Sequence, residues 1–508
     1  MIFINTAIDT TGLFRPFFQI SIPYGVGHLM AVLREANIKF SFIDQQVQKD
    51  VFVEIDKQIQ NHQKPYIFSI STLTESFSAA RKISDILKNK YPDSVIIMGG
   101  LHPTSVPLEI LNSVQSVDYV FAGEAETEIV KIYERIKSGQ DIYDIHGLVY
   151  RRDDEIIFNN PPDLIKDIDS IPEFPYDIFA KYKHYNFGHI MTSRGCPYNC
   201  TFCCVKAVGK RRYRFKSAKS SVQELELLVS EFGQKEIAFF DDNLLANKKR
   251  IFDLCAEIRQ SEILKNVRFS FQARTRDMDE EILQEMYNSG FKTIFFGIET
   301  VSDEILKDIG KDETHTEIES VIRMAQQIGF GIMANFLFCL PNETREVREA
   351  CVEFAIRNKL ELAKFNNVVP YPGTVMYDQT LEKGLDVHKD YINFNSQEVL
   401  VRPFYKKVNF PYLPEGTTSY GMRQEILMAY FRFYFRFKML IRVFTKRSWG
   451  GAIFSYGESF RDVLKKIPAF ILLLIDISIK FELMFLSVFS KNGIKFKDIT
   501  KSIIGFFK

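Results

Sequence analysis

The first 140 residues alternate short apolar runs with stretches that show helical spacing of apolar positions. The apolar runs predict strands at Ile2–Ile4, Phe40–Ile43, Tyr66–Ile70, Val95–Met98 and Tyr119–Phe121, and the helical spacing falls near residues 25–37, 51–61, 75–90 and 107–114. Strands and helices in regular alternation are typical of βαβ units. Residues 1–140 are therefore predicted to form a doubly wound parallel sheet.

Ligands of such sheets bind in the crevice beyond the carboxyl ends of the strands, where glycine lets the backbone come close to a ligand. The candidate binding residues of this first domain are those expected at the strand ends: Ser69, Thr72, Gly99, Gly100, His102, Gly123 and Glu124.

Residues 141–185 are interpreted as a connector. Apolar runs at 147–152 and 156–158 predict a small hairpin, and prolines then interrupt regular structure because proline lacks an N–H and restricts the residue before it. His184 and His189 are expected to be exposed linker residues.

Residues 186–385 repeat the strand–helix alternation. The expected strands are His189–Thr192, Glu236–Phe240, Arg268–Gln272, Thr293–Gly297, Ile332–Phe338 and Lys364–Val369. Six strands with helical intervals predict a partial (β/α)6 barrel similar to a TIM barrel, whose chemistry lies at the carboxyl ends of the strands. The polar side chains there are Asp241, Gln272, Arg274 and Glu299.

Residues 386–508 are expected to be a mostly helical extension. Ser419–Phe444 has helical spacing, with Met428, Phe431 and Phe435 on one side. Further along, the longest uncharged apolar run, Ile467–Ile475, is nine residues, whereas a membrane-spanning helix needs about 20. No span is therefore predicted.

Charge is unevenly distributed along the 508 residues. The net charge is +1, but residues 421–508 carry 16 Lys and Arg against 6 Asp and Glu, a local excess of +10. This asymmetry argues against nucleic acid as a partner of the whole chain. Two interpretations of the extension stay open: it lies at an anionic membrane interface, or its helices pack on the open side of the barrel.

The cysteine pattern bears on compartment. Seven cysteines are an odd number, and four of them fall within positions 196–204, so no disulfide framework is readable. The N-terminus shows neither a charged region nor a cleavage site of a signal peptide. A cytoplasmic protein is expected, with peripheral contact at the inner membrane face if the extension binds lipid.

Cys196, Cys200 and Cys203 form a C-x3-C-x2-C pattern on a turn rich in Gly, Pro and Asn. Thiolates ligate iron–sulfur clusters, which usually take four, so three would leave one iron open. Structural zinc sites prefer two separated pairs of ligands, and no second pair follows. Packing of buried cysteines explains one cysteine better than three on a turn. These are metal-ligand candidates.

This stretch resembles the cluster loop of the radical S-adenosylmethionine (radical SAM) enzymes. The resemblance implies a [4Fe-4S] cluster on the three cysteines, SAM on the open iron, a one-electron reductant such as flavodoxin or ferredoxin, and cleavage of SAM to a 5′-deoxyadenosyl radical. It places Phe202 beside the adenine, and Asp241, Gln272, Arg274 and Glu299 around the rest of SAM. Leu340–Thr344 resembles the G-L-P-G-E-T turn of the family, with Cys339 and Asn342 replacing the two glycines.

Residues 1–140 resemble the cobalamin-binding domain that precedes many radical SAM cores. The match rests on Gly99-Gly100, His102-Pro103-Thr104 and Gly123-Glu124-Ala125-Glu126. The D-x-H-x-x-G motif that supplies a lower histidine ligand to cobalt is absent, since residues 5–12 contain no histidine. The resemblance implies cobalamin bound without that ligand. The alternative is a flavodoxin-like domain that binds no cofactor.

Together the two resemblances imply a cobalamin-dependent methyltransferase that acts on an unactivated carbon of a small molecule, and the aromatic extension points to a lipophilic one. One alternative is an oxidative cyclase or rearrangement enzyme without methyl transfer, similar to the anaerobic Mg-protoporphyrin ester cyclase. A third is a non-catalytic iron–sulfur or corrinoid-binding partner.

Overall fold

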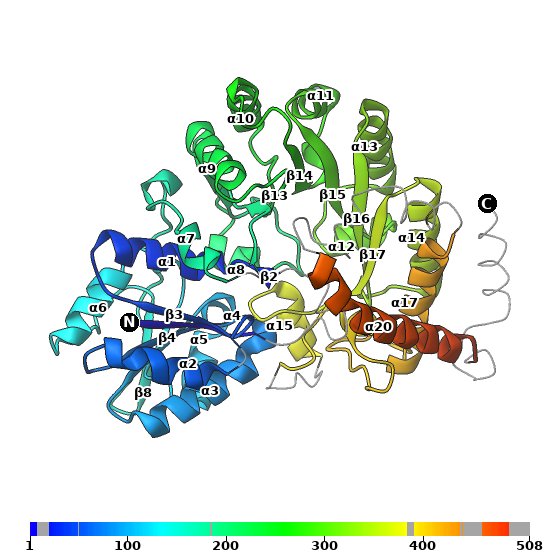
Figure 1. Ribbon diagram of the computed structural model, residues 1–508. Coiled ribbons are helices and arrows are strands. Elements are labelled where there is room, and N and C mark those ends of the chain that lie inside the picture. Colours follow the sequence, from blue (N-terminus) through cyan, green and yellow to red (C-terminus); the bar gives the residue numbers. More distant parts are fainter. Residues whose placement is uncertain are drawn as a thin grey trace. The chain divides into compact units, whose positions relative to one another are not determined.

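The computed structural model describes residues 1–7, 20–48, 50–182, 185–383, 391–436, 439 and 460–486. Their contacts divide them into two compact units. Unit 1 contains the described residues up to 233 together with 370–383 and 391–394, and unit 2 contains 234–369 and the described residues from 395 onward. Each unit is built around its own parallel sheet (Figure 1).

The sheet of unit 1 has seven strands in the order β3-β1-β4-β5-β6-β7-β8. Their bounds are β1 (Ile2–Asn5), β3 (Ser41–Asp44), β4 (Ile67–Ser71), β5 (Val95–Gly99), β6 (Tyr119–Phe121), β7 (Leu148–Arg152) and β8 (Glu155–Phe158). The first five strands are parallel, as predicted. The predicted hairpin forms as well, and it extends this sheet because β7 pairs antiparallel with β6.

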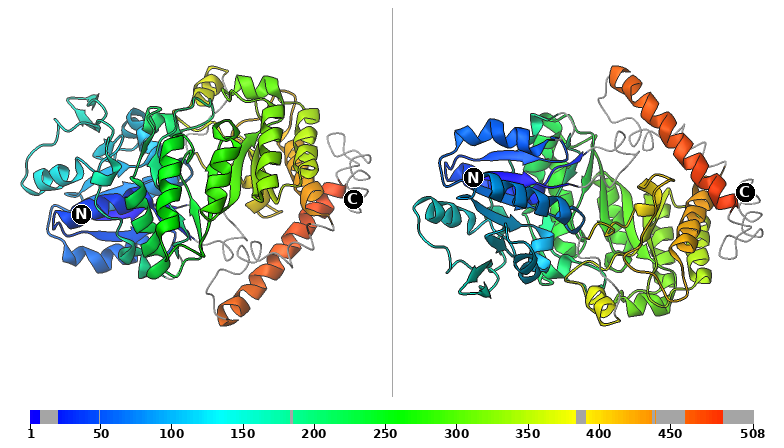
Figure 2. Two further views of the ribbon diagram at one scale, coloured as in Figure 1. Left: turned by 90° about the horizontal axis from the view of Figure 1, so that it is seen from above. Right: turned by 90° about the horizontal axis from the view of Figure 1, so that it is seen from below.

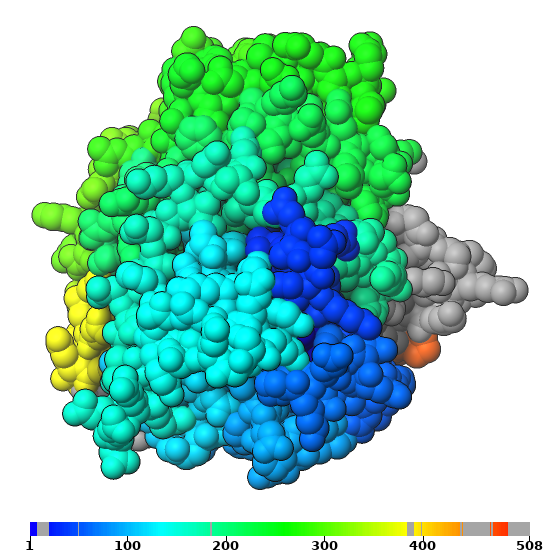
Figure 3. All heavy atoms as spheres, turned by 90° about the vertical axis from the view of Figure 1, so that its left-hand side faces the viewer, coloured from blue at the N-terminus to red at the C-terminus, as the bar shows by residue number. Residues whose placement is uncertain are grey.

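Helices cover this sheet and close its core. They are α1 (Tyr24–Glu35), α2 (Val51–Gln58), α3 (Phe77–Lys90), α4 (Leu101–Ser105), α5 (Pro107–Ser113) and α6 (Ile129–Lys137). Ile4 lies level with Ile43 and Ile70 in adjacent strands, and all three are fully buried. Strands buried on both faces read as continuous apolar runs, which is why the sequence located them closely. Figure 3 shows the blue and cyan N-terminal elements side by side on one face.

The three-cysteine loop of unit 1 is closed by a short antiparallel pair, β11 (Ser193–Arg194) and β12 (Arg214–Phe215). Helix α8 (Val205–Gly209) lies between these strands, and α9 (Ala218–Ser230) follows, capped by Ser217. The expectation that His189 is exposed is wrong. In β10 (His189–Ile190) it is 1% exposed, its ring lies against Tyr24, and burial lowers its pKa to about 4. His184 lies outside the described residues.

Unit 2 contains five parallel strands that neighbour one another in chain order: β13 (Glu236–Phe239), β14 (Arg268–Ala273), β15 (Phe291–Glu299), β16 (Gly331–Phe338) and β17 (Leu362–Asn367). The intervening helices are α10 (Lys248–Gln260), α11 (Glu280–Asn288), α12 (Asp303–Asp308), α13 (His315–Ile328) and α14 (Arg345–Arg357). Strand order that follows chain order is the arrangement of a barrel segment, so the predicted fold class is confirmed.

Burial alternates along these strands. In β14, Phe269, Phe271 and Ala273 are buried, whereas Ser270 and Gln272 lie on the more exposed face. Figures 1 and 2 show the helices that cover one face of this sheet.

The C-terminal extension adds α16 (Glu398–Val401), α17 (Ser419–Tyr434) and α20 (Phe460–Leu486) to unit 2. The Tyr434 hydroxyl donates to Ala363 O of β17 over 2.8 Å, and Met428 and Phe431 are buried. Helix α17 therefore packs on the barrel, which is one of the two interpretations left open for the extension. Phe435, predicted to share that side, is 47% exposed instead, because it lies just past the end of the helix. Within the described part of the chain, no helix is long and apolar enough to cross a membrane.

Candidate functional site

The strand order of unit 1 reverses between β1 and β4, and ligands of doubly wound sheets bind at such a switch point. Three hydroxyls meet there: Thr6 Oγ1 donates to Ser76 Oγ over 2.9 Å, and Thr72 Oγ1 is 2.9 Å from the same atom. The predicted position of Ser69 needs correction, since it lies inside β4, level with Phe3 and Ile97, and the strand continues to Ser71.

Glycines allow two strand-end loops to come close at this edge. Gly100 has φ +110°, and a Cβ placed on it would lie 2.6 Å from Thr72 O. Gly99 ends β5, and Gly123 after β6 has φ +119°. Thr104 joins the loops, since its hydroxyl donates to Gly100 O and accepts from Gly123 N. No other residue type fits at Gly100 without moving the backbone.

His102 lies just behind these loops in an aromatic pocket. It is 1% exposed, and its ring centroid is 4.5 Å from that of Phe77 and 4.6 Å from that of Tyr391. Burial lowers the pKa of His102 to about 3, so the ring is neutral at pH 7. Nδ1 lies 3.3 Å from Thr74 Oγ1, and Nε2 has no hydrogen-bond partner among the described residues.

Two leucines stand exposed at the same edge. Leu73 follows β4 and is 50% exposed, and Leu101 follows β5 and is 41% exposed. Apolar side chains, close-approach glycines and neutral hydroxyls together fit a large ligand with an apolar face and amide groups, which is the chemistry of a corrin. A lower histidine ligand to cobalt would be encoded near residues 8–12. These residues lie outside the described ranges, and their sequence contains no histidine.

Glu124 connects this edge to the cysteine loop. Arg214 donates to both of its carboxylate oxygens, at 2.7 and 2.9 Å, and Arg194 lies 3.3 Å from Oε1. Arg194 also donates to Glu126 over 2.7 Å. Burial alone would raise the pKa of Glu124, but these guanidinium groups hold it below its usual value. Because Arg194 precedes the first cysteine by two residues, these ion pairs tie Glu124 to the start of the cysteine loop.

The loop presents its cysteines at the surface. Cys196, Cys200 and Cys203 are partly exposed and form no disulfide, and Phe202 is partly exposed beside them. Gly195 has φ +83°, and a Cβ there would lie 2.3 Å from Arg212 O. The backbone immediately before Cys196 therefore has no room for a side chain.

The donor set tests which metal group fits. Within the described ranges, no three His, Cys, Asp or Glu side chains converge on a single metal ion. Each thiolate of a cubane cluster binds a different iron, so three cysteines spread around one loop suit a cluster better than a zinc ion. By contrast, Cys255, Cys339 and Cys351 are buried, and burial raises their thiol pKa values, to about 11 for Cys255 and about 12 for Cys351. Such thiols are poor ligands.

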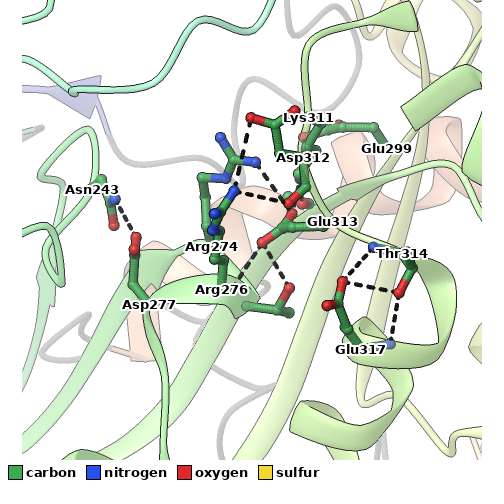
Figure 4. Close-up of polar contacts among 12 residues, drawn as sticks. Asn243, Arg274, Arg276, Asp277, Glu299, Lys311, Asp312, Glu313, Thr314 and Glu317 are labelled. Atoms are coloured by element: carbon green, nitrogen blue, oxygen red, sulfur yellow. Dashed lines mark hydrogen bonds and ion pairs between the residues drawn. The ribbon is translucent and has the colours of Figure 1, made fainter. Parts of the chain in front are cut away.

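At the carboxyl edge of the unit 2 sheet, Glu299 is the last residue of β15 and has φ +68°, a backbone conformation that costs a non-glycine residue energy (Figure 4). Lys311 Nζ lies 3.6 Å from its Oε1 and also donates to Gly297 O, and Asn335 Nδ2 donates to Oε2 over 3.3 Å. Burial raises the pKa of Glu299, and the Lys311 charge opposes this.

Glu313 extends the network toward Arg274. Its carboxylate accepts hydrogen bonds from Thr275 Oγ1 and Arg276 N, both at 2.8 Å, and lies 3.6 Å from both Lys311 Nζ and Arg274 Nη2. Despite burial, these two cations hold the pKa of Glu313 below its usual value. A capping box of Thr314 and Glu317 begins α13 directly after this segment and fixes its path.

The structure thus brings Arg274 and Glu299 together through Lys311 and Glu313, neither of which the sequence singled out. The charged run Lys311-Asp312-Glu313 was the sequence pattern that could have pointed to these two residues. Asp241 is 1% exposed, and its Oδ1 lies 3.9 Å from Arg250 Nη2. Gln272 is exposed near the end of β14.

A lysine on the inner face of the sheet was also missed. Lys364 of β17 lies level with Asn335 of β16, and its Nζ is 5.3 Å from the centroid of the Phe295 ring. Burial lowers its pKa. The alternation of inward and outward positions along β17 could have identified this lysine from the sequence.

The turn after β16 reproduces glycine geometry without glycine. Cys339 has φ +67° and Asn342 has φ +60°, the conformation that the glycines of the G-L-P-G-E-T turn adopt without strain. Glu343 in this turn accepts from Cys339 N over 2.7 Å and lies 3.2 Å from Arg348 Nη1. Burial outweighs the Arg348 charge and raises the pKa of Glu343 to about 7.

Family models match two parts of the chain: a B12 binding domain at residues 12–132 and the Radical SAM superfamily at residues 190–355. An uncharacterised methyltransferase of Pyrococcus horikoshii is 30% identical over 83% of this chain and 89% of its own length. The chain belongs to the radical SAM enzymes that carry a B12-binding domain.

One further relative and two solved structures resemble this chain. The anaerobic magnesium-protoporphyrin IX monomethyl ester cyclase of Cereibacter sphaeroides is 26% identical over 82% of this chain and 67% of its own length. Among solved structures, the cobalamin-dependent SAM radical enzyme OxsB superposes with a TM-score of 0.68 at 16% identity, covering 99% of this chain and 74% of OxsB. The methyltransferase TsrM from Kitasatospora setae gives 0.62 at 18% identity, covering 75% of this chain and 74% of TsrM.

Membership confirms the predicted family and its cofactors, a [4Fe-4S] cluster, SAM and cobalamin. The residues matched by the two family models lie inside the segments predicted as cobalamin-binding domain and radical SAM core. The individual roles of the site residues remain predictions.

Proposed function

We propose that this protein methylates an unactivated carbon of a small organic molecule, using SAM and cobalamin. The observation that carries the proposal is the carboxyl edge of unit 1, where Gly100, Leu73 and Leu101 leave room and apolar contact for a corrin. Similarity to a methyltransferase over most of its length supports this choice.

When bound, the cofactors supply hydrogen abstraction from carbon and donation of a methyl group. The chain supplies placement. Cys196, Cys200 and Cys203 hold the cluster, and Glu124 fixes their loop through Arg194. Arg274 is suited to the carboxylate of SAM and Glu299 to its ammonium or ribose hydroxyls, since each is held by buried partners before ligand arrives.

The inner face of the unit 2 sheet indicates the substrate class. Phe295 and Met333 provide apolar surface there, and Lys364 provides a cation whose Nζ lies 5.3 Å from the centroid of the Phe295 ring. A cation in that setting favours a substrate with an apolar skeleton and an anionic group such as a carboxylate or phosphate. An external one-electron donor such as flavodoxin or ferredoxin completes the reaction.

The test begins with anaerobic reconstitution with iron, sulfide and hydroxocobalamin, followed by desalting and absorbance spectroscopy. We expect cluster and stoichiometric corrin. With a chemical reductant and SAM labelled in its methyl group, label should reach the protein-bound corrin, as read by mass spectrometry, and 5′-deoxyadenosine should form. Cluster without corrin would remove methyl transfer. Absence of 5′-deoxyadenosine with every candidate substrate would count against any radical SAM activity.

The second candidate is an oxidative cyclase or rearrangement enzyme that uses the same cofactors without methyl transfer. Similarity to the magnesium-protoporphyrin cyclase over 82% of this chain favours it. Corrin that binds but never acquires label from SAM would select this candidate. A non-catalytic partner role is disfavoured by the buried Arg274–Glu313–Lys311–Glu299 network, which a cluster carrier does not require.

A further inference from the structure

Helix α20 turns Asp476 and Lys480 inward and presents large aliphatic side chains outward, whereas an ordinary surface helix buries its apolar face; its Glu482 is exposed. Its inward side chains are Leu473, Asp476, Lys480 and Met484, each no more than 6% exposed. It is the long orange-to-red helix in Figures 1 and 2.

Polar contacts hold this orientation. Lys480 Nζ lies 2.6 Å from Asp476 Oδ2 and donates to Leu400 O over 2.8 Å, while Phe404 N donates to Asp476 Oδ1 over 2.7 Å. Rotating the helix to hide its aliphatic face would break these bonds. Aromatic packing of Phe481 and Phe485 against Phe431 of α17 adds to the attachment.

The outward face carries five large aliphatic side chains that are 45–55% exposed: Ile471, Leu472, Leu474, Ile475 and Leu483. Four of them fall within five residues, so they form a cluster rather than scattered single residues. Clusters of this kind mark contact surfaces.

The neighbouring segment supplies the remaining features of a lipid-binding surface. Tyr405, directly after the residue that bonds Asp476, is 70% exposed, and the exposed Lys406 and Lys407 follow it. Phe435, stacked on Phe431, is 47% exposed. Residues 421–508 carry a net charge of +10. Exposed aliphatic, aromatic and basic side chains in this part of unit 2 suit the interface of an anionic bilayer.

We propose that the outward face of α20, together with Tyr405, Lys406 and Lys407, is a docking surface for an anionic membrane. The helix lies along the bilayer surface and does not span it, since Asp476 and Lys480 interrupt it. This assigns membrane contact to α20 rather than to α17, whose Tyr430, Phe431 and Phe433 are buried. The proposal stands independently of the reaction that the enzyme catalyses.

The experiment uses the full reconstituted protein and flotation with vesicles of phosphatidylcholine alone or of phosphatidylcholine mixed with phosphatidylglycerol. The double variant L472Q/I475Q should lose binding at least tenfold, and K406E/K407E should lose it only on the anionic vesicles. The matched control I86Q/I263Q replaces two aliphatic residues that are 46% and 47% exposed elsewhere. It should bind like the unaltered protein.

Retained corrin absorbance and an unchanged thermal midpoint show that each variant is folded. Failure of the unaltered protein to float with either vesicle overturns the proposal. So does equal binding by L472Q/I475Q. If instead light scattering shows a dimer that only L472Q/I475Q dissociates, without flotation, the face joins two copies of the chain and the proposal is wrong.

Discussion

The carboxyl edges of the two parallel sheets differ in chemistry although both are built from βα units. In unit 1 the edge presents glycines, hydroxyls and the exposed Leu73 and Leu101, and its acidic residue Glu124 is neutralised by Arg194 and Arg214. In unit 2 the edge presents Arg274, Lys311, Glu313 and Glu299 in one buried network.

The difference shows that one topology serves two kinds of ligand. A neutral edge with apolar side chains suits a large macrocycle, whose binding depends mainly on buried area. A preorganised charged edge suits a small zwitterion such as the methionyl part of SAM, because fixed charges in a buried site interact more strongly than in water. The comparison yields predictions that separate the two edges.

The largest effect is expected from Cys200→Ala, which removes one thiolate of the cluster loop. Iron and sulfide content after reconstitution should fall and SAM cleavage should cease, while corrin binding is kept. Cys204→Ala, in the same loop, is the control and should retain the cluster. Retained SAM cleavage in Cys200→Ala would refute the cluster assignment.

Glu124→Gln tests whether the charge of the unit 1 edge is structural. It leaves Arg214 buried without its carboxylate and leaves Arg194 with Glu126 alone, and breaking a buried pair costs about 3–5 kcal/mol. Denaturant unfolding should show this loss, whereas Asp154→Asn in the exposed hairpin turn should show almost none. An unchanged unfolding free energy would mean that the arginines have other partners.

Glu299→Gln should weaken SAM binding roughly tenfold to a hundredfold, since a hydrogen bond to a charged group contributes about 1.5–3 kcal/mol. Calorimetric titration with SAM measures this, and corrin uptake should not change. The exposed Glu304→Gln is the matched control. Equal loss in both variants would show a nonspecific charge effect.

Leu73→Asp should have the opposite selectivity. A carboxylate placed against an apolar corrin face should reduce cobalamin retention on the order of tenfold, and SAM affinity should stay the same. Ile86→Asp on α3, where Ile86 is 46% exposed, is the control. Undiminished cobalamin retention in Leu73→Asp would move the corrin away from this edge.

The last two effects concern the pH dependence of stability, and they have opposite signs in the two units. The pKa of Glu343 is raised to about 7 in the folded state, so the folded protein holds a proton that the unfolded chain lacks between about pH 4.5 and 7. Stability from this group is complete below pH 4.5 and is lost as pH rises to 7, with a slope near 1.4 kcal/mol per pH unit. Glu343→Gln should remove that slope.

The pKa shift of His102 makes stability depend on pH in the opposite direction. Its pKa is lowered to about 3, so between pH 6.5 and 3 the unfolded chain binds a proton that the folded protein does not. The contribution of this group to the free energy of unfolding is complete above pH 6.5 and falls as pH is lowered. His102→Asn should therefore reduce the loss of stability between pH 6.5 and 3. Unfolding measured across pH 4–8 checks both variants, and identical profiles for all three proteins would contradict both pKa shifts.

The sequence by itself determined the family, the cluster loop and the positions of most strands. The three cysteines lie within eight residues, so their chemistry needs no tertiary information, and strands buried on both faces show as apolar runs whatever their neighbours are. Even the Cys339 and Asn342 turn was recognisable from local residues, since positive φ is a local property.

Only the tertiary structure decided which distant charges meet and which face of a helix points inward. Lys311 and Glu313 join Glu299 to Arg274 because parallel strands end at one edge, a relation that spacing along the chain does not encode. His189 is buried by packing against Tyr24. In α20 the sequence shows Asp476 and Lys480 as interruptions of an apolar run. Their inward direction depends on Leu400 and Phe404, more than 70 residues earlier in the chain.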